Sequence, residues 1–175
     1  MTSRYLAELF RDKEKLMFDR VTHTLEKEFF EYLLGLEVKK AGRYLYFFSL
    51  MVLQGDKIHA DLGEGEENML LKKLASLVRE EVRGTDTIGR IDNNKFFIIL
   101  DQADFHASYK VGERINERIK HYAFRVDGHE VMLRGSIGVA CFPTHASDLE
   151  TLIQKAESAL RMAKEGGGGR VHIPE

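Results

Sequence analysis

The sequence predicts an α/β (α+β) fold in which helices flank a mixed sheet of about five strands, with an antiparallel hairpin at the centre of the sheet. Helix-like and strand-like stretches alternate along most of the chain. Residues 44–53 are apolar on both faces, which is typical of a central strand covered on both sides. Two strand-like runs meet at Asn93-Asn94, which predicts a hairpin, and a hairpin means that the sheet is not all parallel.

The expected order of elements is α-α-β-α-β-β-α-β-β-α-β. Helices are expected over residues 3–16, 24–36, 66–82, 103–121 and 147–163, and strands over residues 44–53, 86–91, 96–100, 124–126, 130–140 and 170–173.

The first helix carries an apolar stripe at helical spacing, and two interpretations stay open. It is either packed on the domain or a coupling or dimerisation helix, which would divide the chain into a segment 1–16 and a domain 17–175. The second helix is expected to start at a Thr22 or Thr24 N-cap and to end at Ala41-Gly42. The strand over 44–53 is expected to stop at Gln54, with an irregular stretch after it.

Local signals define the elements of the second half. Gly84 is a plausible C′ residue for the third helix. Asn tolerates a positive φ, which suits Asn93-Asn94 to a tight turn. Asp127-Gly128 predicts a second hairpin turn, and Ser147-x-x-Glu150 has the spacing of a capping box. The helix over 103–121 is expected to turn one row of residues inward: Ala107, Val111, Ile115 and Ile119.

Bulk composition excludes several classes of protein. The 175 residues, 43% of them hydrophobic and 31% charged, suit one globular domain with a sizeable core. The net charge of −2 and the pI near 6.4 provide no general basic field, so we expect no contact with nucleic acid or with a membrane. Cys141 is the only cysteine, which excludes an intramolecular disulfide and suits a reducing compartment; we expect a cytoplasmic protein.

Five segments, in order, resemble the motifs of the GGDEF family, the fold of diguanylate cyclases. Residues 19–22 resemble the family's Asp-x-Leu-Thr entry motif, and residues 44–53 its first core strand. Residues 90–96 lie where Arg-x-Gly-Gly-Asp-Glu-Phe would be, and residues 136–139 match Ser-Ile-Gly-Val outright. Residues 156–164 resemble the Ala-Asp-x-x-x-Tyr-x-Ala-Lys helix. The resemblance covers about residues 17–173 and implies a nucleotide-cyclase, ferredoxin-like sheet.

The same resemblance implies that catalysis is lost. Cyclases of this family join two GTP molecules with a divalent metal held by carboxylates, which are the ligands that a hard cation needs. The signature here is Asp92-Asn93-Asn94-Lys95-Phe96, without either glycine and with the charge of the second acidic position reversed. Met51 and Leu53 occupy the positions of the family's Asp-x-Asp pair. We therefore expect no metal site, no bound Mg²⁺ and no diguanylate cyclase activity.

Three further residues are possible remnants of a nucleotide site. By an ungapped count, His59 and Asn68 fall where the family has its guanine-binding Asn and Asp. Lys164 matches a family lysine that contacts the GTP phosphates. They leave open a residual GTP-binding domain or a weak cyclase.

The base of the hairpin keeps a regulatory motif. Arg83 and Asp86 match the Arg-x-x-Asp site at which cyclic di-GMP inhibits many cyclases of this family, and Arg114 matches the arginine that completes it. Arginine can donate two parallel hydrogen bonds to guanine O6 and N7, and a carboxylate can accept from guanine N1–H and its amino group. Without the resemblance, an arginine and an aspartate three residues apart are more simply an exposed salt bridge.

The resemblance thus implies a catalytically inactive receptor for cyclic di-GMP. Its expected partners are the ligand and either a second copy of the chain or another signalling protein. An interaction scaffold with no nucleotide affinity, in which the motif is a relic, stays open as the alternative.

Overall fold

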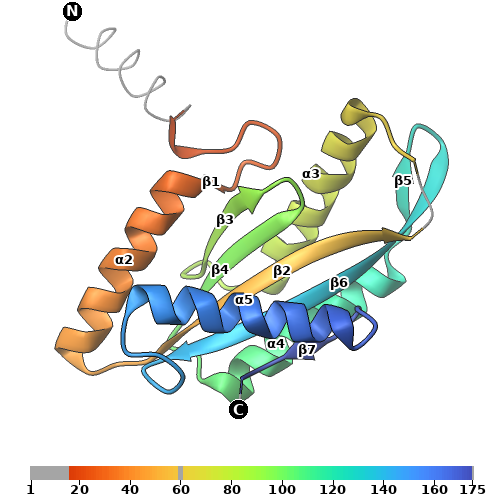
Figure 1. Ribbon diagram of the computed structural model, residues 1–175. Helices are drawn as coiled ribbons and strands as arrows, with labels where there is room; N and C mark the ends of the chain where they lie inside the picture. Colours follow the sequence, from red (N-terminus) through yellow and green to blue (C-terminus); the bar gives the residue numbers. More distant parts are fainter. Residues whose placement is uncertain (1–15, 59–60, 175) are drawn as a thin grey trace, which may run out of the picture.

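The computed structural model describes residues 16–58 and 61–174, and it confirms the predicted α/β class (Figure 1). The elements in order are β1 Leu25–Glu26, α2 Lys27–Tyr44, β2 Phe48–Ile58, α3 Glu64–Glu81, β3 Thr87–Asp92, β4 Lys95–Asp101, α4 Phe105–His121, β5 Phe124–Val126, β6 His129–Phe142, α5 Leu149–Glu165 and β7 Val171–His172. The predicted helix over 3–16, and with it the proposed separate segment 1–16, lies outside the described residues except for Leu16. Within the described ranges no helix combines the length and apolarity needed to cross a bilayer.

The strands form one mixed sheet in the order β1-β3-β4-β2-β6-β5, with β7 also paired to β6. β2 lies in the middle and pairs antiparallel with both β4 and β6, as expected for a run that is apolar on both faces. The sheet has seven strands rather than about five. The short strands β5 and β7 were expected, whereas the two-residue strand β1 was not. The hairpin β3–β4 places β4 directly beside β2, so these two strands together form the centre of the sheet.

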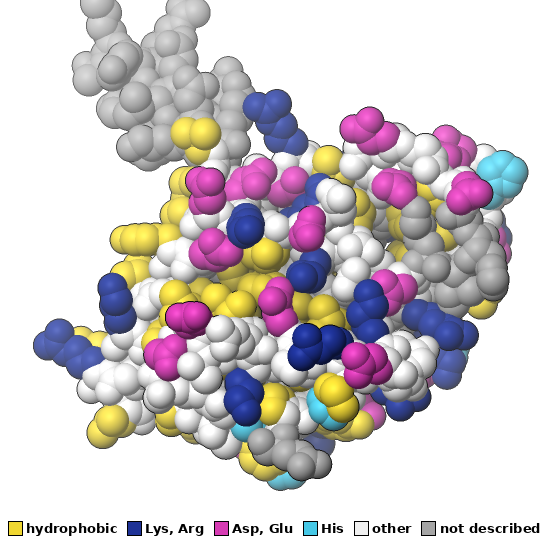
Figure 2. Space-filling model, in the orientation of Figure 1, with side chains coloured by type: hydrophobic (Ala, Val, Ile, Leu, Met, Phe, Trp, Pro, Cys, Tyr) yellow, Lys and Arg dark blue, Asp and Glu magenta, His cyan; other side chains and the backbone are white. Residues whose placement is uncertain are grey.

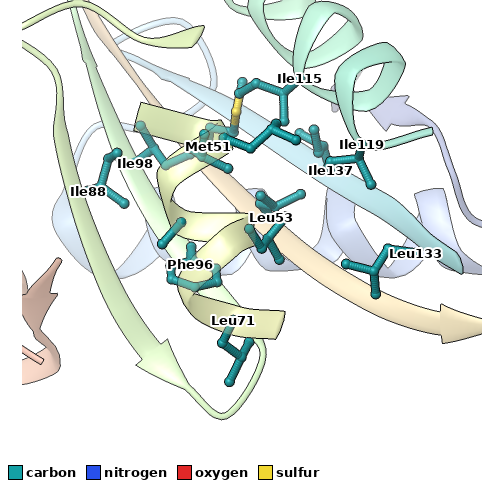
Figure 3. Packing of buried hydrophobic residues seen from close by; sticks show 14 of the residues in the cluster. Met51, Leu53, Leu71, Ile88, Phe96, Ile98, Ile115, Ile119, Leu133 and Ile137 are labelled. Carbon is teal, nitrogen blue, oxygen red and sulfur yellow. The ribbon is translucent and has the colours of Figure 1, made fainter. Parts of the chain in front are cut away.

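Helices cover both faces of the sheet (Figure 1). α2 and α5 pack on one face over a cluster that includes Phe30, Phe48 and Phe97. α3 and α4 pack on the other face, where Met51 lies among Ile98, Ile115 and Ile119 (Figure 3). The long strands therefore bury side chains on both faces, which explains why their sequences do not alternate between apolar and polar residues.

The predicted limits of α2 are wrong at both ends. Thr22 and Thr24 do not cap it: the Thr22 hydroxyl donates to Asp19 at 2.6 Å and lies 2.8 Å from the Thr24 hydroxyl, in a turn before β1. The helix continues through Ala41-Gly42 and ends only where Leu45 adopts the left-handed conformation, with φ 57° and its N–H donating to the Ala41 carbonyl.

β2 begins at Phe48 rather than at Tyr44, because Tyr44 is the last residue of α2, and it extends beyond its predicted end. It runs on to Ile58 because its pairing with β6 continues past Gln54 as far as Met132. Gly84 is not the C′ residue of α3: the helix ends at Glu81 with Val82 in an extended conformation as its C-cap.

Three local predictions differ in detail. Asn93-Asn94 do form the hairpin turn, but neither has a positive φ, and a register shift between Arg90 and Asp92 closes the turn instead. Asp148, not Ser147, caps α5, because its carboxylate accepts from the Thr151 N–H at 2.9 Å. On α4, Ile115 and Ile119 are buried as expected, but Ala107 is exposed and Val111 only half-buried, and Ser108 and Gly112 take the inward positions instead. The Asp127-Gly128 turn is confirmed, with φ of 46° and 85°.

Candidate functional site

Arg83, Asp86 and Arg114 lie around one small hollow. Arg83 and Asp86 belong to the connection between α3 and β3, and Arg114 lies on α4; all three line a hollow of about 120 Å³. The floor of this hollow is formed by residues at the end of β4 and on α4 that include Leu100 and Val111. The fold thus brings together three residues that the sequence places up to 31 positions apart (114 minus 83).

Asp86 holds the turn that presents Arg83. Its Oδ2 accepts from the Arg83 N–H at 2.7 Å, and its Oδ1 accepts from the N–H of Asp101, at the end of β4, at 3.0 Å. The Asp86 N–H in turn donates to the Arg83 carbonyl at 3.0 Å. A carboxylate offers about four acceptor positions, so about two remain on Asp86 after these bonds.

The two arginines differ in how they are held. The Arg83 side chain is exposed, and among the described residues its guanidinium has no hydrogen bond or ion pair. Arg114 is held by the last residue of α3: its Nε donates to Glu81 Oε2 at 2.7 Å, and its Nη2 donates to the Glu81 carbonyl. Arg83 is therefore free to meet a ligand, whereas Arg114 is fixed in direction.

A second hollow, of about 430 Å³, lies on the other side of the turn and shares Arg83 and Asp86 with the first. Apolar side chains line much of it, among them Phe18, Leu33 and Ile88. The smaller hollow is too small to enclose a dinucleotide.

Residues at the tip of the hairpin and behind it are buried or held by hydrogen bonds. Met51 and Leu53 are fully buried in the core, as is Phe96. The Asn94 side chain is bonded to β2: its Nδ2 donates to the Gly55 carbonyl at 2.8 Å, and its Oδ1 accepts from Gln54 at 3.2 Å. The backbone N–H of Gly55 donates to the Asn94 carbonyl at 3.1 Å, which fastens the turn further.

The two charged side chains of the tip, Asp92 and Lys95, each have a partner. Lys95 lies 3.2 Å from Glu157 of α5, and the Asp92 carboxylate accepts from the Asn93 N–H at 2.8 Å. Figure 2 shows basic and acidic side chains interleaved on the face over α5, not a single acidic cluster. Among the described residues there is no group of three His, Cys, Asp or Glu side chains placed to hold a metal. The side chains present do not fit the divalent cation that the family uses, because buried hydrocarbon stands where carboxylates are needed.

Arg90 ties the tip to the start of the domain. It donates to the Asn93 carbonyl from Nη2 at 2.9 Å, and its Nη1 lies 3.2 Å from Asp19 Oδ1. Burial alone would raise the pKa of Asp19, but the hydrogen bonds from Thr22 and the charge of Arg90 outweigh it, and the pKa is lowered. The entry motif at 19–22 is therefore a structural brace of the hairpin.

Two of the three possible nucleotide contacts, Lys164 and Asn68, fall within the described residues. The Lys164 ammonium donates to Gln54 Oε1 at 3.0 Å and forms an ion pair with Asp56 at 3.4 Å. Asn68 is half-buried on α3 and does not line the hollow of about 270 Å³ between α3 and the tip, whose described walls include Leu70 and Leu74. His59 lies outside the described residues.

Sequence analysis missed the groups that hold these residues in place. Glu81 was not singled out, although two acidic residues in the last turn of a helix are unfavourable there and could have drawn attention. The sequence places Gln54 and Asp56 at a predicted strand end and carries no sign of their bonds to Asn94 and Lys164.

Comparison with known proteins identifies the family to which this fold belongs. The family model described as "Diguanylate cyclase, GGDEF domain" matches residues 16–170. Diguanylate cyclase DosC of Escherichia coli (strain K12) is 29% identical over 174 residues, which cover 96% of this chain and 38% of DosC. The chain thus spans well under half the length of that curated relative.

Two solved structures share the fold. The GGDEF domain of YfiN from Pseudomonas aeruginosa superposes with a TM-score of 0.84 at 23% identity, covering 90% of this chain and 94% of that one. The coiled coil and GGDEF domain of DgcB from Caulobacter crescentus, solved in complex with c-di-GMP, superposes with a TM-score of 0.87 at 17% identity, covering 99% and 93%. With the family model matched over nearly all of the described residues, the chain belongs to the GGDEF family of diguanylate cyclase domains.

Proposed function

We propose that this chain is a non-catalytic GGDEF domain that binds cyclic di-GMP through Arg83, Asp86 and Arg114. The observation that carries the proposal is the arrangement of these three residues around one turn. Arg83 has a free guanidinium, Asp86 keeps about two acceptor positions, and Arg114 is fixed beside them. Such a set can donate to guanine O6 and N7 and accept from its N1–H and amino group.

Loss of catalysis is the second half of the proposal. It is supported by the donor set at the tip, where buried Met51 and Leu53, amide Asn94 and cationic Lys95 replace carboxylates. No step through Mg²⁺ can be derived from these side chains, and Lys164 is engaged by Asp56. Product formed from GTP and Mg²⁺ by the purified chain would contradict this half of the proposal alone.

Calorimetric titration with cyclic di-GMP tests the binding. Charge-assisted hydrogen bonds contribute roughly 1.5–3 kcal/mol each, so three of them supply roughly 4.5–9 kcal/mol, and the upper end of that range corresponds to a dissociation constant of roughly micromolar. Arg83→Ala should weaken binding at least tenfold. Arg125→Ala is the matched control, because Arg125 is also exposed but lies on β5, near the opposite end of α3 (Figure 1). Equal affinity in all three proteins, or no heat with the native chain, refutes the proposal.

A specific observation favours a second candidate, an interaction module with no nucleotide affinity. Both carboxylate oxygens of Asp86 accept backbone N–H groups, and Arg114 is paired with Glu81, so both residues also have structural roles. This candidate predicts that Asp86→Asn lowers stability while cyclic di-GMP leaves the melting temperature of the native chain unchanged. Assembly with a second copy or with another signalling protein, and a cytoplasmic location, stay predictions under either candidate.

A further inference from the structure

We infer that Glu81 is a positioning residue for cyclic di-GMP binding, because it fixes the Arg114 guanidinium with one edge free at the hollow. The inference rests on the proposed function and adds to it a residue outside the Arg-x-x-Asp motif. Glu81 itself lines the same hollow as Arg83, Asp86 and Arg114.

The location of Glu81 breaks a local rule of helix chemistry. Glu80 and Glu81 are the last two residues of α3, where the negative end of the helix dipole disfavours acidic side chains. The Glu81 side chain is also largely buried, at 13% exposure. A carboxylate at such a place needs compensation, and two arginines of α4 supply it. Departures of this kind from local preference concentrate at functional sites.

Glu81 is held from two sides. Its Oε2 accepts from Arg114 Nε at 2.7 Å, and its Oε1 lies 3.0 Å from Arg118 Nε. Arg118 reaches on to Glu80 at 3.0 Å. Because both oxygens are occupied, the carboxylate cannot rotate without losing an ion pair, and it is a rigid acceptor for Arg114.

The bonds to Glu81 use only one edge of the Arg114 guanidinium. Nε donates to the Glu81 carboxylate and Nη2 to the Glu81 carbonyl. A guanidinium has five N–H donors, so about three remain, on Nη1 and on the outer side of Nη2. Among the described residues Nη1 has no partner, and the Arg114 side chain is 53% exposed. The free edge is the pair of nitrogens that can donate in parallel to guanine O6 and N7.

Holding Arg114 in this way lowers the cost of binding. A free arginine side chain loses rotamer entropy when a ligand immobilises it, whereas one that is already fixed has lost most of it on folding. The charge of Glu81 acts in the opposite direction, since the ligand carries two phosphodiester charges and a nearby carboxylate repels them. Positioning and repulsion can be separated, because Glu80 contributes the same charge one residue away but contacts only Arg118 among the described residues.

The test is a calorimetric titration of cyclic di-GMP into the native chain and its Glu81→Ala, Glu81→Gln and Glu80→Ala variants. Glu80→Ala removes one charge without releasing Arg114, so its affinity should stay within twofold of native or become tighter. Glu81→Ala should bind about five- to tenfold more weakly than Glu80→Ala. Glu81→Gln keeps an acceptor oxygen and should recover part of the loss. Melting temperatures of all variants establish that they are folded.

A double-mutant cycle completes the test. In an Arg114→Ala background, Glu81→Ala should cause no further loss of affinity, because there is no guanidinium left to position. Further weakening there would mean that Glu81 contacts the ligand itself, and would overturn the positioning role. Equal affinity of Glu81→Ala and Glu80→Ala, with native binding still abolished by Arg83→Ala, overturns this inference but not the proposed function. Absence of binding by the native chain overturns both.

Discussion

We expect Asp19 to contribute a large part of the free energy of unfolding of this domain, and Asp19→Asn is the variant that tests this contribution. The Asp19 carboxylate accepts from the Thr22 N–H at 2.7 Å, from the Thr22 hydroxyl at 2.6 Å and from Arg90 at 3.2 Å. Its side chain is 13% exposed and that of Arg90 is 17% exposed, so water cannot fully replace these bonds. Arg90 carries the effect onward to the hairpin tip through the Asn93 carbonyl.

The magnitude follows from the contacts. Hydrogen bonds to a charged group contribute roughly 1.5–3 kcal/mol each, and neighbouring bonds are not additive. Asn keeps one acceptor oxygen but loses the ion pair and one further acceptor, so we expect Asp19→Asn to lower the free energy of unfolding by about 2–4 kcal/mol. For a domain of this size, that lowers the melting temperature by roughly 5–15 °C.

Urea denaturation at several pH values is the assay, with Asp61→Asn as an exposed control of the same charge change. The pKa of Asp19 in the folded state lies below its ordinary value of 3.8. Its contribution is therefore complete at neutral pH and is lost as the pH falls below about 4 through the folded pKa. The stability gap between native and Asp19→Asn should be constant from pH 5 to 8 and should shrink below it. A gap under about 0.5 kcal/mol, or one that persists in acid, refutes the brace.

Three further predictions concern single positions. Leu45→Gly should raise the stability by roughly 0.5–1 kcal/mol, because Leu45 is 90% exposed and holds a left-handed backbone with φ 57°; a loss on urea denaturation would contradict this. Gly138→Ala should lower the free energy of unfolding by about 3 kcal/mol or more, because a Cβ there would lie 2.2 Å from the Leu160 nitrogen of α5. Gly65→Ala, where a Cβ would have no atom within 4 Å, should be neutral or stabilising. Equal effects of the two substitutions would refute the packing argument. Cys141 should react with Ellman's reagent at pH 8 only after unfolding, because burial raises the pKa of its thiol to about 11; rapid labelling of the native chain would contradict this.

Much of the fold can be predicted from the sequence, because a long apolar run can adopt few types of secondary structure. The stretch at 44–53 could only be a buried strand or a short buried helix, and its β-branched and aromatic content favours the strand. Its limits were wrong because pairing with β6, not composition, keeps Gly55 and Asp56 extended. Likewise, α2 continues past its predicted end at Ala41-Gly42 to Tyr44, because Gly42 is tolerated inside a packed helix.

The candidate site was predictable only in part. Motif spacing predicted that Arg83, Asp86 and Arg114 lie near one another, and all three line one hollow. What spacing could not supply was the second partner of each residue. Asp101 and Glu81 meet the site through sheet pairing and helix packing; the local sequence shows that the acidic pair at the end of α3 is unusual, but it does not reveal the partner of either residue. Tertiary contacts of this kind decide whether an arginine is free, like Arg83, or fixed, like Arg114.

The central claim is that this domain has kept a ligand site and lost its chemistry, and titration with cyclic di-GMP tests it most directly. We predict saturable binding with a dissociation constant of roughly micromolar, weakened at least tenfold in Arg83→Ala and kept in Arg125→Ala. Absence of binding by the native chain, or binding that Arg83→Ala leaves unchanged, would contradict it.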